Sequence, residues 1–230
     1  MTGGERRVGR PRADRDWADT GRTPREELLD AAAELFTTLG YGATTTRAVA
    51  ERAGMRQATM YHYFGGKESL FAELLEATVR PTAELARRLL AEHARPAERR
   101  LWELCRAEVV ALCGGPHDLG ALFLLPETRG ERFGVFRRLR AELRSGYGGL
   151  LAEADRAVGR HGPGLMGGAG VAGEGERREL RLDLVVGLIE GVALAYRAPG
   201  RGERPIGEFA GATADAVLRV AGLGTVTVRD

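Results

Sequence analysis

The sequence has few of the residues from which redox and metal sites are built. It contains only two cysteines, Cys105 and Cys113, which lie eight residues apart in a segment with helical periodicity. This spacing fits neither a disulfide framework nor a CxxC site, so we interpret both as buried reduced thiols, with a redox sensor as the alternative. The four histidines are scattered without metal-ligand spacing, and we therefore expect no metal site.

Long apolar runs are absent as well. No run approaches the roughly 20 residues that a membrane-spanning helix needs, and the charged N-terminus lacks the apolar core of a signal peptide. We therefore expect a cytoplasmic protein without a membrane partner. The sequence also has no GxSxG and no P-loop, and no strand pattern precedes its glycine-rich segment, so we expect neither an enzyme nor a bound cofactor.

The stretch from Thr44 to Phe64 predicts two short helices joined by a tight turn. A threonine run precedes a helical pattern, and we expect Thr45 to cap the first helix. Gly54 can adopt the left-handed conformation that ends a helix, and Met55 after it supplies an apolar plug. A second helix is expected from Gln57 to Tyr63. A small residue at the helix crossing and a glycine in the turn are typical of a helix-turn-helix.

The charge of the chain is uneven, although its net value is only +2. Residues 44–67 carry four cations against one carboxylate, and the second helix leaves hydrogen-bonding and aromatic groups beside them. Such groups suit base edges and phosphates. Lys67, the only lysine in the chain, follows two glycines and opens a helix, where backbone N–H groups and an ammonium can hold one phosphate together.

A family resemblance rests on Leu28 to Leu75, LLDAAAELFTTLGYGATTTRAVAERAGMRQATMYHYFGGKESLFAELL. This segment resembles the DNA-binding domain of the TetR family of bacterial transcriptional regulators. The likeness includes LF followed by GY, the TTxRxVA helix start, the AG turn, the TxYxYF recognition helix and the KExL that opens the next helix. Arg56 stands where the family usually has a small capping serine, and Gln57 where many members have lysine.

The resemblance and the residue chemistry together predict the DNA contacts. We expect Arg47 and Gln57 to read bases, because arginine pairs with guanine and glutamine with adenine in bidentate fashion. Thr45, Tyr61, His62 and Lys67 are expected to hold phosphates. The full predicted set is Thr45, Thr46, Arg47, Arg56, Gln57, Ala58, Thr59, Tyr61, His62 and Lys67, with Arg10 and Arg12 of the N-terminal arm.

Residues 1–23 are expected to form a flexible basic arm and linker. Four arginines stand against one glutamate in residues 1–12, and RVGRPR resembles segments that lay arginine into a narrow minor groove. A solubilising disordered tail explains the same composition. Aspartates at 14, 16 and 19 would be repelled by phosphate, so the contacting part should end near Arg12.

The remaining pattern predicts an all-α protein. Residues 24–69 should form a three-helix DNA-binding domain, and residues 70–230 a helical effector-binding and dimerisation domain. Pro81 predicts a kink or break in the long helix from Lys67 to about His93. Residues 161–175 are rich in glycine and predict a loop. No strand-like alternation precedes the TVTV near the C-terminus.

Two features of the second domain bear on function. The segments 176–197 and 205–223 are apolar over a broad arc, and the resemblance implies a homodimer with a four-helix interface, while burial inside one subunit is the alternative. Aromatic side chains in the middle helices could line an apolar pocket with a polar anchor, although core packing accounts for them equally well. The candidate pocket residues are Trp102, Cys105, Phe123, Phe133, Phe136, Tyr147 and Glu190.

These observations favour a dimeric regulator, most simply a repressor, that binds palindromic operator DNA and is released by a small apolar or amphipathic effector. A DNA-binding regulator that responds to a partner protein or to no effector fits the same residues. A helical ligand-binding enzyme is the third hypothesis, and the missing catalytic motifs argue against it.

Overall fold

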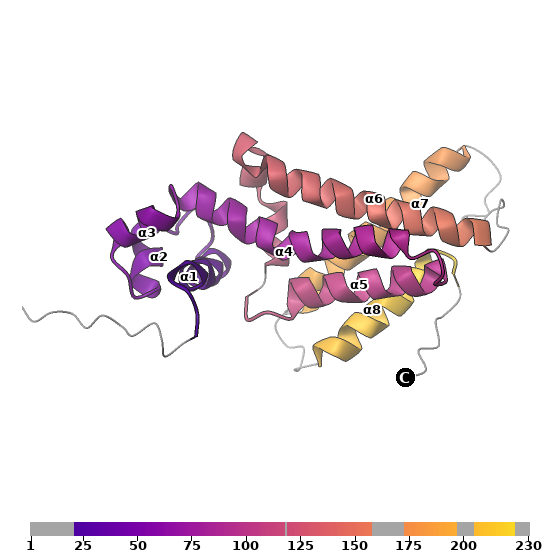
Figure 1. Ribbon diagram of the computed structural model, residues 1–230, viewed down its shortest axis with the longest axis horizontal. Coiled ribbons are helices and arrows are strands. Elements are labelled where there is room, and N and C mark those ends of the chain that lie inside the picture. The colour runs from indigo at the N-terminus through magenta and orange to yellow at the C-terminus, as the bar shows by residue number, and fades with distance from the viewer. Residues whose placement is uncertain (1–20, 118, 158–172, 197–204, 224–230) are drawn as a thin grey trace, which may run out of the picture.

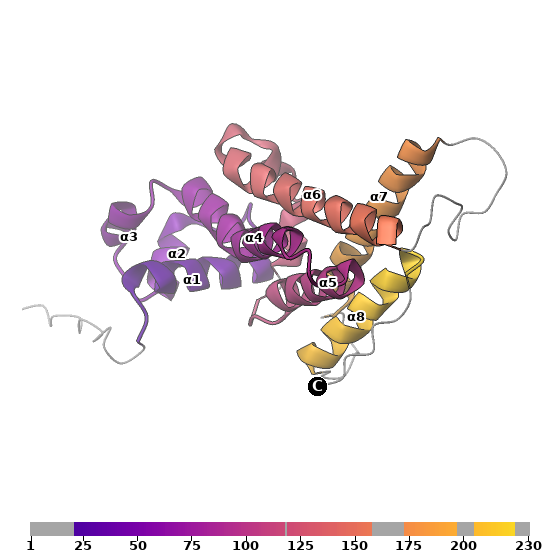
Figure 2. The same ribbon diagram turned by 45° about the vertical axis from the view of Figure 1, so that its right-hand side comes forward.

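The computed structural model describes residues 21–117, 119–157, 173–196 and 205–223, and every regular element within them is helical. Arg10, Arg12, most of the expected arm, most of the glycine-rich segment and the TVTV segment lie outside the described residues. A small helical group at one end, which holds the helix-turn-helix, joins a larger bundle through one long helix (Figures 1 and 2). Among the described helices, none has the length and apolar character of a membrane span.

Helix α1, Pro24–Thr38, begins as the sequence predicts. The Thr23 side chain accepts a hydrogen bond from the Glu26 backbone N–H, and the Glu26 carboxylate accepts one from the Thr23 backbone. This reciprocal cap satisfies two free N–H groups and lowers the pKa of Glu26 through the backbone hydrogen bond from Thr23. The buried side of α1, which includes Leu28 and Phe36, packs toward α2, Thr46–Arg52, and α4, Lys67–Ala91.

Helix α4 connects the two parts of the molecule. It remains helical through Pro81, so of the predicted kink or break the break does not occur, and the direction of the helix changes along its length (Figure 1). The proposed domain boundary between residues 69 and 70 therefore lies inside a continuous helix. A displacement at the far end of α4 can thus reach the helix-turn-helix without crossing a loop.

The larger bundle contains α5, Ala97–Cys113, three short 3-10 turns, and α6, Gly134–Ala157. The turns are η2, Gly120–Leu124, η3, Pro126–Arg129, and η4, Glu131–Phe133. The chain ends its described part in α7, Glu174–Tyr196, and α8, Ile206–Val220. Helices α4 and α6 pack closely because α6 has glycine at the crossing: a Cβ added at Gly146 would lie 2.7 Å from the Ala86 Cβ.

Arg100 on α5 is a buried charge that our sequence analysis did not single out. It is 2% exposed, and its guanidinium donates to the carbonyl oxygens of Leu89 and Arg95 and to the Glu153 carboxylate. The Leu89 carbonyl belongs to the last turn of α4, where it also accepts a hydrogen bond from the Glu92 backbone N–H at 3.3 Å. Arg100 therefore closes the α4–α5 corner and ties it to α6.

Candidate functional site

The turn between α2 and α3, Gln57–Tyr63, has the geometry expected of a helix-turn-helix. Thr45 caps α2, as predicted, by accepting a hydrogen bond from the Ala48 backbone N–H at 3.1 Å. Gly54 has φ +72°, the left-handed region that glycine adopts at low cost. Met55 is buried as a plug, and its N–H donates to the Ala50 carbonyl at 2.8 Å. The angle between the two helices is therefore held by both backbone and core contacts.

Helix α3 presents an exposed polar face. Met60 is fully buried beneath it, whereas Gln57, Ala58, Tyr61 and His62 are exposed. Thr59 is half-buried. With one side of the helix anchored, the other can enter a groove as a rigid unit, which is how recognition helices read DNA.

Three of the predicted contact residues form one hydrogen-bonded group. The Gln57 amide donates to the Thr46 hydroxyl at 2.9 Å, and the Thr46 hydroxyl lies 3.3 Å from the Tyr61 hydroxyl. These contacts join the start of α3 to the start of α2. They restrict the rotamers of Gln57 and Tyr61 before any partner binds, which lowers the entropy cost of recognition.

The arginines of this region are not equivalent. Arg47 pairs with Glu51 at 2.8 Å, but both side chains are largely exposed, so this pair stabilises little and can be exchanged. Arg52 pairs with Glu34 on α1, which makes it a brace between helices. Arg56 is exposed at the N-cap of α3, makes no side-chain cap, and forms no ion pair with a described residue. The departure from a capping serine therefore leaves α3 uncapped by a side chain and places a free cation at its N-terminus.

Lys67 has a different role in the structure from the phosphate contact that we expected. Its ammonium donates to the carbonyl oxygens of Tyr41 at 2.8 Å, Thr44 at 2.9 Å and Gly42 at 3.4 Å. It also lies 4.3 Å from the centre of the Tyr41 ring. All three donors are thus directed at the loop between α1 and α2. A phosphate would have to compete with these internal contacts, which the lysine's position after two glycines did not reveal.

Most of the candidate pocket residues lie in the core. Cys105 and Phe133 are almost completely buried, and Phe123 stacks edge-on against Phe136 with centroids 5.2 Å apart. Phe133 packs against Phe71 on α4 and belongs to the aromatic core below the helix-turn-helix. Trp102 donates its indole N–H to Asp215 on α8 at 2.9 Å. Core packing, rather than a ligand pocket, therefore explains the positions of these five residues.

Tyr147 and Glu190 do line a cavity, of about 330 Å³, between α5, α6 and α7. Its other polar walls are Glu108 on α5, Arg140 and Arg144 on α6, and Asp183 on α7. Arg140 forms an ion pair with Glu190, and Arg144 pairs with Asp183 at 2.8 Å. The cavity is therefore charged, unlike the aromatic pocket expected from the sequence.

Glu108 is the group in this cavity that our sequence analysis missed. It is 6% exposed and accepts a hydrogen bond from the Tyr147 hydroxyl at 2.5 Å on Oε2. Burial raises the pKa of Glu108 to about 7, against the lowering effects of Tyr147 and Arg140. The available signal was its position on the apolar stripe of α5, three residues after Cys105 and four before Leu112. A carboxylate in that register faces the interior.

The neighbouring thiol is poorly suited to redox chemistry. Burial raises the pKa of the Cys105 thiol, and the nearby Glu108 adds to the effect. Because the thiolate is the reactive form, Cys105 is held in its inert state. Cys113 is also buried and reduced. Both observations agree with the interpretation as buried reduced thiols.

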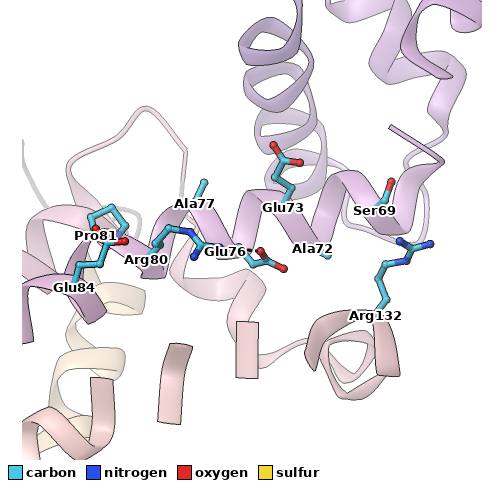
Figure 3. A pocket seen from close by; sticks show the side chains of 9 residues that line it. All are labelled: Ser69, Ala72, Glu73, Glu76, Ala77, Arg80, Pro81, Glu84 and Arg132. Carbon is cyan, nitrogen blue, oxygen red and sulfur yellow. Dashed lines mark hydrogen bonds and ion pairs between the residues drawn. The ribbon is translucent and has the colours of Figure 1, made fainter. Parts of the chain in front are cut away.

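A second hollow, of about 600 Å³, follows the outer side of α4 (Figure 3). Eight of its nine lining residues come from α4 itself, and Arg132 from η4 completes it. Its carboxylates are partly engaged, because Glu73 pairs with Arg25 and Glu76 with Arg80. A hollow walled chiefly by one helix is an open groove, and it encloses a ligand less well than the cavity beside Glu108.

Comparisons with known proteins agree with this geometry. A profile of the family described as "Bacterial regulatory proteins, tetR family" matches residues 28–74. The transcriptional repressor KstR2 of Rhodococcus jostii (strain RHA1) is 46% identical over 65 residues, which cover 28% of this chain and 31% of the repressor. The chain thus spans only about a third of the length of this curated relative. The solved structure of Mycobacterium smegmatis AmtR is 42% identical, covers 90% of this chain and 89% of its own, and has a TM-score of 0.75.

One class of protein combines this helix-turn-helix with a helical second domain, and the similarity to AmtR extends along most of the chain. The chain belongs to the TetR family of bacterial transcriptional regulators. The solved structure of AibR in complex with isovaleryl coenzyme A and operator DNA shares the fold, with a TM-score of 0.65 at 14% identity. At that identity the likeness concerns the fold alone.

Proposed function

We propose that this protein is a homodimeric repressor that binds an inverted-repeat operator through α3 and changes its affinity when a small molecule enters the α5–α6–α7 cavity. The observation that carries the DNA-binding part is the exposed polar face of α3 on a turn fixed by Thr45, Gly54 and Met55. The named repressor functions of similar proteins support the same reading.

We assign base reading to Gln57 on α3 and Arg47 on α2. Ala58 and Thr59, which follow Gln57 on α3, are placed close to the bases in this proposal. Gln57 is preoriented by Thr46, and Arg47 can release its exposed partner Glu51 for a guanine. Thr45, Tyr61 and His62 are the proposed phosphate ligands. Arg56 takes the role first given to Lys67, because it is exposed and forms no ion pair within the part of the chain that the structure describes, whereas the Lys67 ammonium is engaged with carbonyls.

The proposed dimer forms mainly through α7. This helix exposes Leu180, Leu184 and Leu194, and Gly187 and Gly191 lie on the same side with open space beside them. The spacing of these residues forms one continuous stripe along the helix. Helix α8 has a different environment, because Ala210, Ala214 and Val217 are buried and its most extensive contact is with α5 of the same chain. We therefore give α8 a smaller share of the interface than the sequence suggested.

A single substitution tests the dimer. Leu184→Glu places a charge in the exposed stripe, and we expect a monomer in sedimentation together with loss of tight operator binding. Leu124→Glu, at a 60% exposed leucine on η2, is the matched control and should remain a dimer. A Leu184→Glu protein that sediments as the wild type does would place the interface elsewhere.

Switching is proposed to act through α4 and α7. Helix α7 supplies one wall of the cavity and the exposed stripe, and α4 runs unbroken from its contact with α6 to the helix-turn-helix. A ligand shifts this equilibrium only by its differential affinity for the two arrangements, and about 3 kcal/mol would release DNA by about two orders of magnitude. The alternative without a small-molecule effector predicts that ligands which bind the free protein leave the DNA complex unchanged.

A further inference from the structure

We infer that the α5–α6–α7 cavity is a site for a small organic cation, such as a primary amine, whose ammonium group pairs with the Glu108 carboxylate. The inference concerns the ligand class of the proposed effector cavity. Only the statement that the ligand is an effector rests on the proposed function. The cavity and its charges are present in the chain whether or not it binds DNA.

The Glu108 side chain is buried, and only one of its two oxygens is engaged by a described residue. Its Oε2 is occupied by the Tyr147 hydroxyl, whereas Oε1 accepts no hydrogen bond from any residue that the structure describes. A carboxylate this deeply buried is costly unless it is paired. A ligand that donates to Oε1 would remove that cost, and a cationic donor would remove more of it than a neutral one.

The balance of charge around the cavity also favours a cation. The cations Arg140 and Arg144 are already matched by Glu190 and Asp183 of α7, and Arg144 also pairs with Glu179. Arg140 lies in addition over the Phe123 ring, with its guanidinium carbon 5.2 Å from the centroid. With the arginines paired, ionised Glu108 gives the lining an excess of negative charge. An anionic ligand would have to break these ion pairs, whereas a cation needs to break none.

The size of the cavity favours a small ligand. A volume of about 330 Å³ is near the lower end of the roughly 300 to 1,000 Å³ of ligand pockets. This space suits a compact molecule. Gly187, one of the exposed glycines of the stripe, is among the residues that line the cavity.

Binding of a cation should be coupled to a proton. The charged or titratable groups near Glu108 are Cys105 on α5, Tyr147 and Arg140 on α6, and Glu190 on α7. Because the pKa of Glu108 is about 7, its carboxyl is mostly protonated at pH 6 and must lose that proton to pair with an ammonium. We expect the affinity for the cation to rise about tenfold from pH 5 to pH 6 and to level off above pH 7.

The test is calorimetric titration of the full chain, without DNA, using three probes of matched size: benzylamine, benzyl alcohol and benzoate. Benzylamine should bind at least about tenfold more tightly than the other two at pH 7.5, given the strength of a charge-assisted hydrogen bond. At pH 6, titrations in buffers with different ionisation enthalpies should show release of about one proton per site.

Two variants complete the test. Glu108→Gln keeps an acceptor for Tyr147 but removes the charge, and it should lose the preference for benzylamine and the proton release. Glu142→Gln, at a half-exposed carboxylate that pairs with Arg87 on α4, is the control and should bind as the wild type does. Circular dichroism at pH 5 checks that both variants fold.

The inference is overturned if benzoate or benzyl alcohol binds as tightly as benzylamine, if none of the three binds at millimolar concentration, or if Glu108→Gln keeps the preference. Since DNA is absent, the outcome is separate from that of the proposed function. A chain that binds benzylamine but no operator would refute the proposed regulator and leave this site standing.

Discussion

Replacing Glu108 by glutamine should change how stability depends on pH. Burial raises the pKa of Glu108 from 4.5 to about 7, so the folded state holds its proton over a range in which the unfolded chain has lost it. Stability therefore falls as pH rises from about 4.5 to 7 and is level above that range. One pKa unit corresponds to about 1.36 kcal/mol, so ionised Glu108 costs the folded state about 3 kcal/mol at pH 8.

The assay is urea unfolding of the wild type and Glu108→Gln at pH 5, 6, 7 and 8, followed by far-ultraviolet circular dichroism. The protomer concentration is kept constant, because dimerisation contributes to the apparent stability. We expect the variant to gain about 2 to 3 kcal/mol relative to the wild type between pH 5 and pH 8, because a small part of the cost is already present at pH 5. Glu142→Gln, whose carboxylate is half-exposed, should show no such gain. A difference between Glu108→Gln and the wild type that stays constant with pH would refute our account of the buried carboxyl.

Four further substitutions test the packing and the DNA-binding surface. Arg100→Met should lower the free energy of unfolding by about 3 kcal/mol in the same assay, because it removes the buried guanidinium that pairs with the Glu153 carboxylate and donates to the Leu89 carbonyl. Gly146→Ala should cost about 1 to 3 kcal/mol, because the new methyl group would overlap Ala86, and an unchanged urea midpoint would contradict that contact. In binding assays against an operator library, Gln57→Ala should relax specificity at one position per half-site by about 1 to 3 kcal/mol. Arg56→Ala should instead weaken binding to all sequences alike and reduce the dependence of log affinity on log salt concentration by about one unit per site. If both variants lowered the affinity for every library sequence by the same factor, the roles of Gln57 and Arg56 would be misassigned.

The DNA-binding half was predictable from the sequence because local signals determine it. The cap at Thr45, the turn at Gly54 and the plug at Met55 each depend on residues within one or two helical turns. The all-helical class was predictable for the same reason, since apolar periodicity is itself local. Helix ends were within a few residues, as for α4, which was expected to end near His93 and ends at Ala91.

The environment of single side chains was not predictable in the same way. Lys67 reaches carbonyls 23 to 26 residues earlier in the chain, and no local pattern indicates such a contact. The aromatic residues divide between core and cavity according to helix packing, so Phe136 and Tyr147 have similar signals in sequence but different surroundings. The sequence did contain a signal for Glu108, namely a carboxylate on a buried stripe. Its role in the cavity, however, depends on Arg140 and Glu190 already being paired with each other, which the sequence does not show.

The most direct test of the regulator proposal is selection of DNA from a random library by the purified protein, followed by footprinting of the selected sequence. We predict an inverted repeat whose half-sites lie about one helical turn, or a multiple of it, apart, as two reading heads related by a two-fold axis require. Protection should weaken at the α3-contacted positions when Gln57 is replaced by alanine. A selected pool without a dyad, or binding that does not discriminate among sequences at physiological salt, would contradict the proposal that this chain reads an operator through α3.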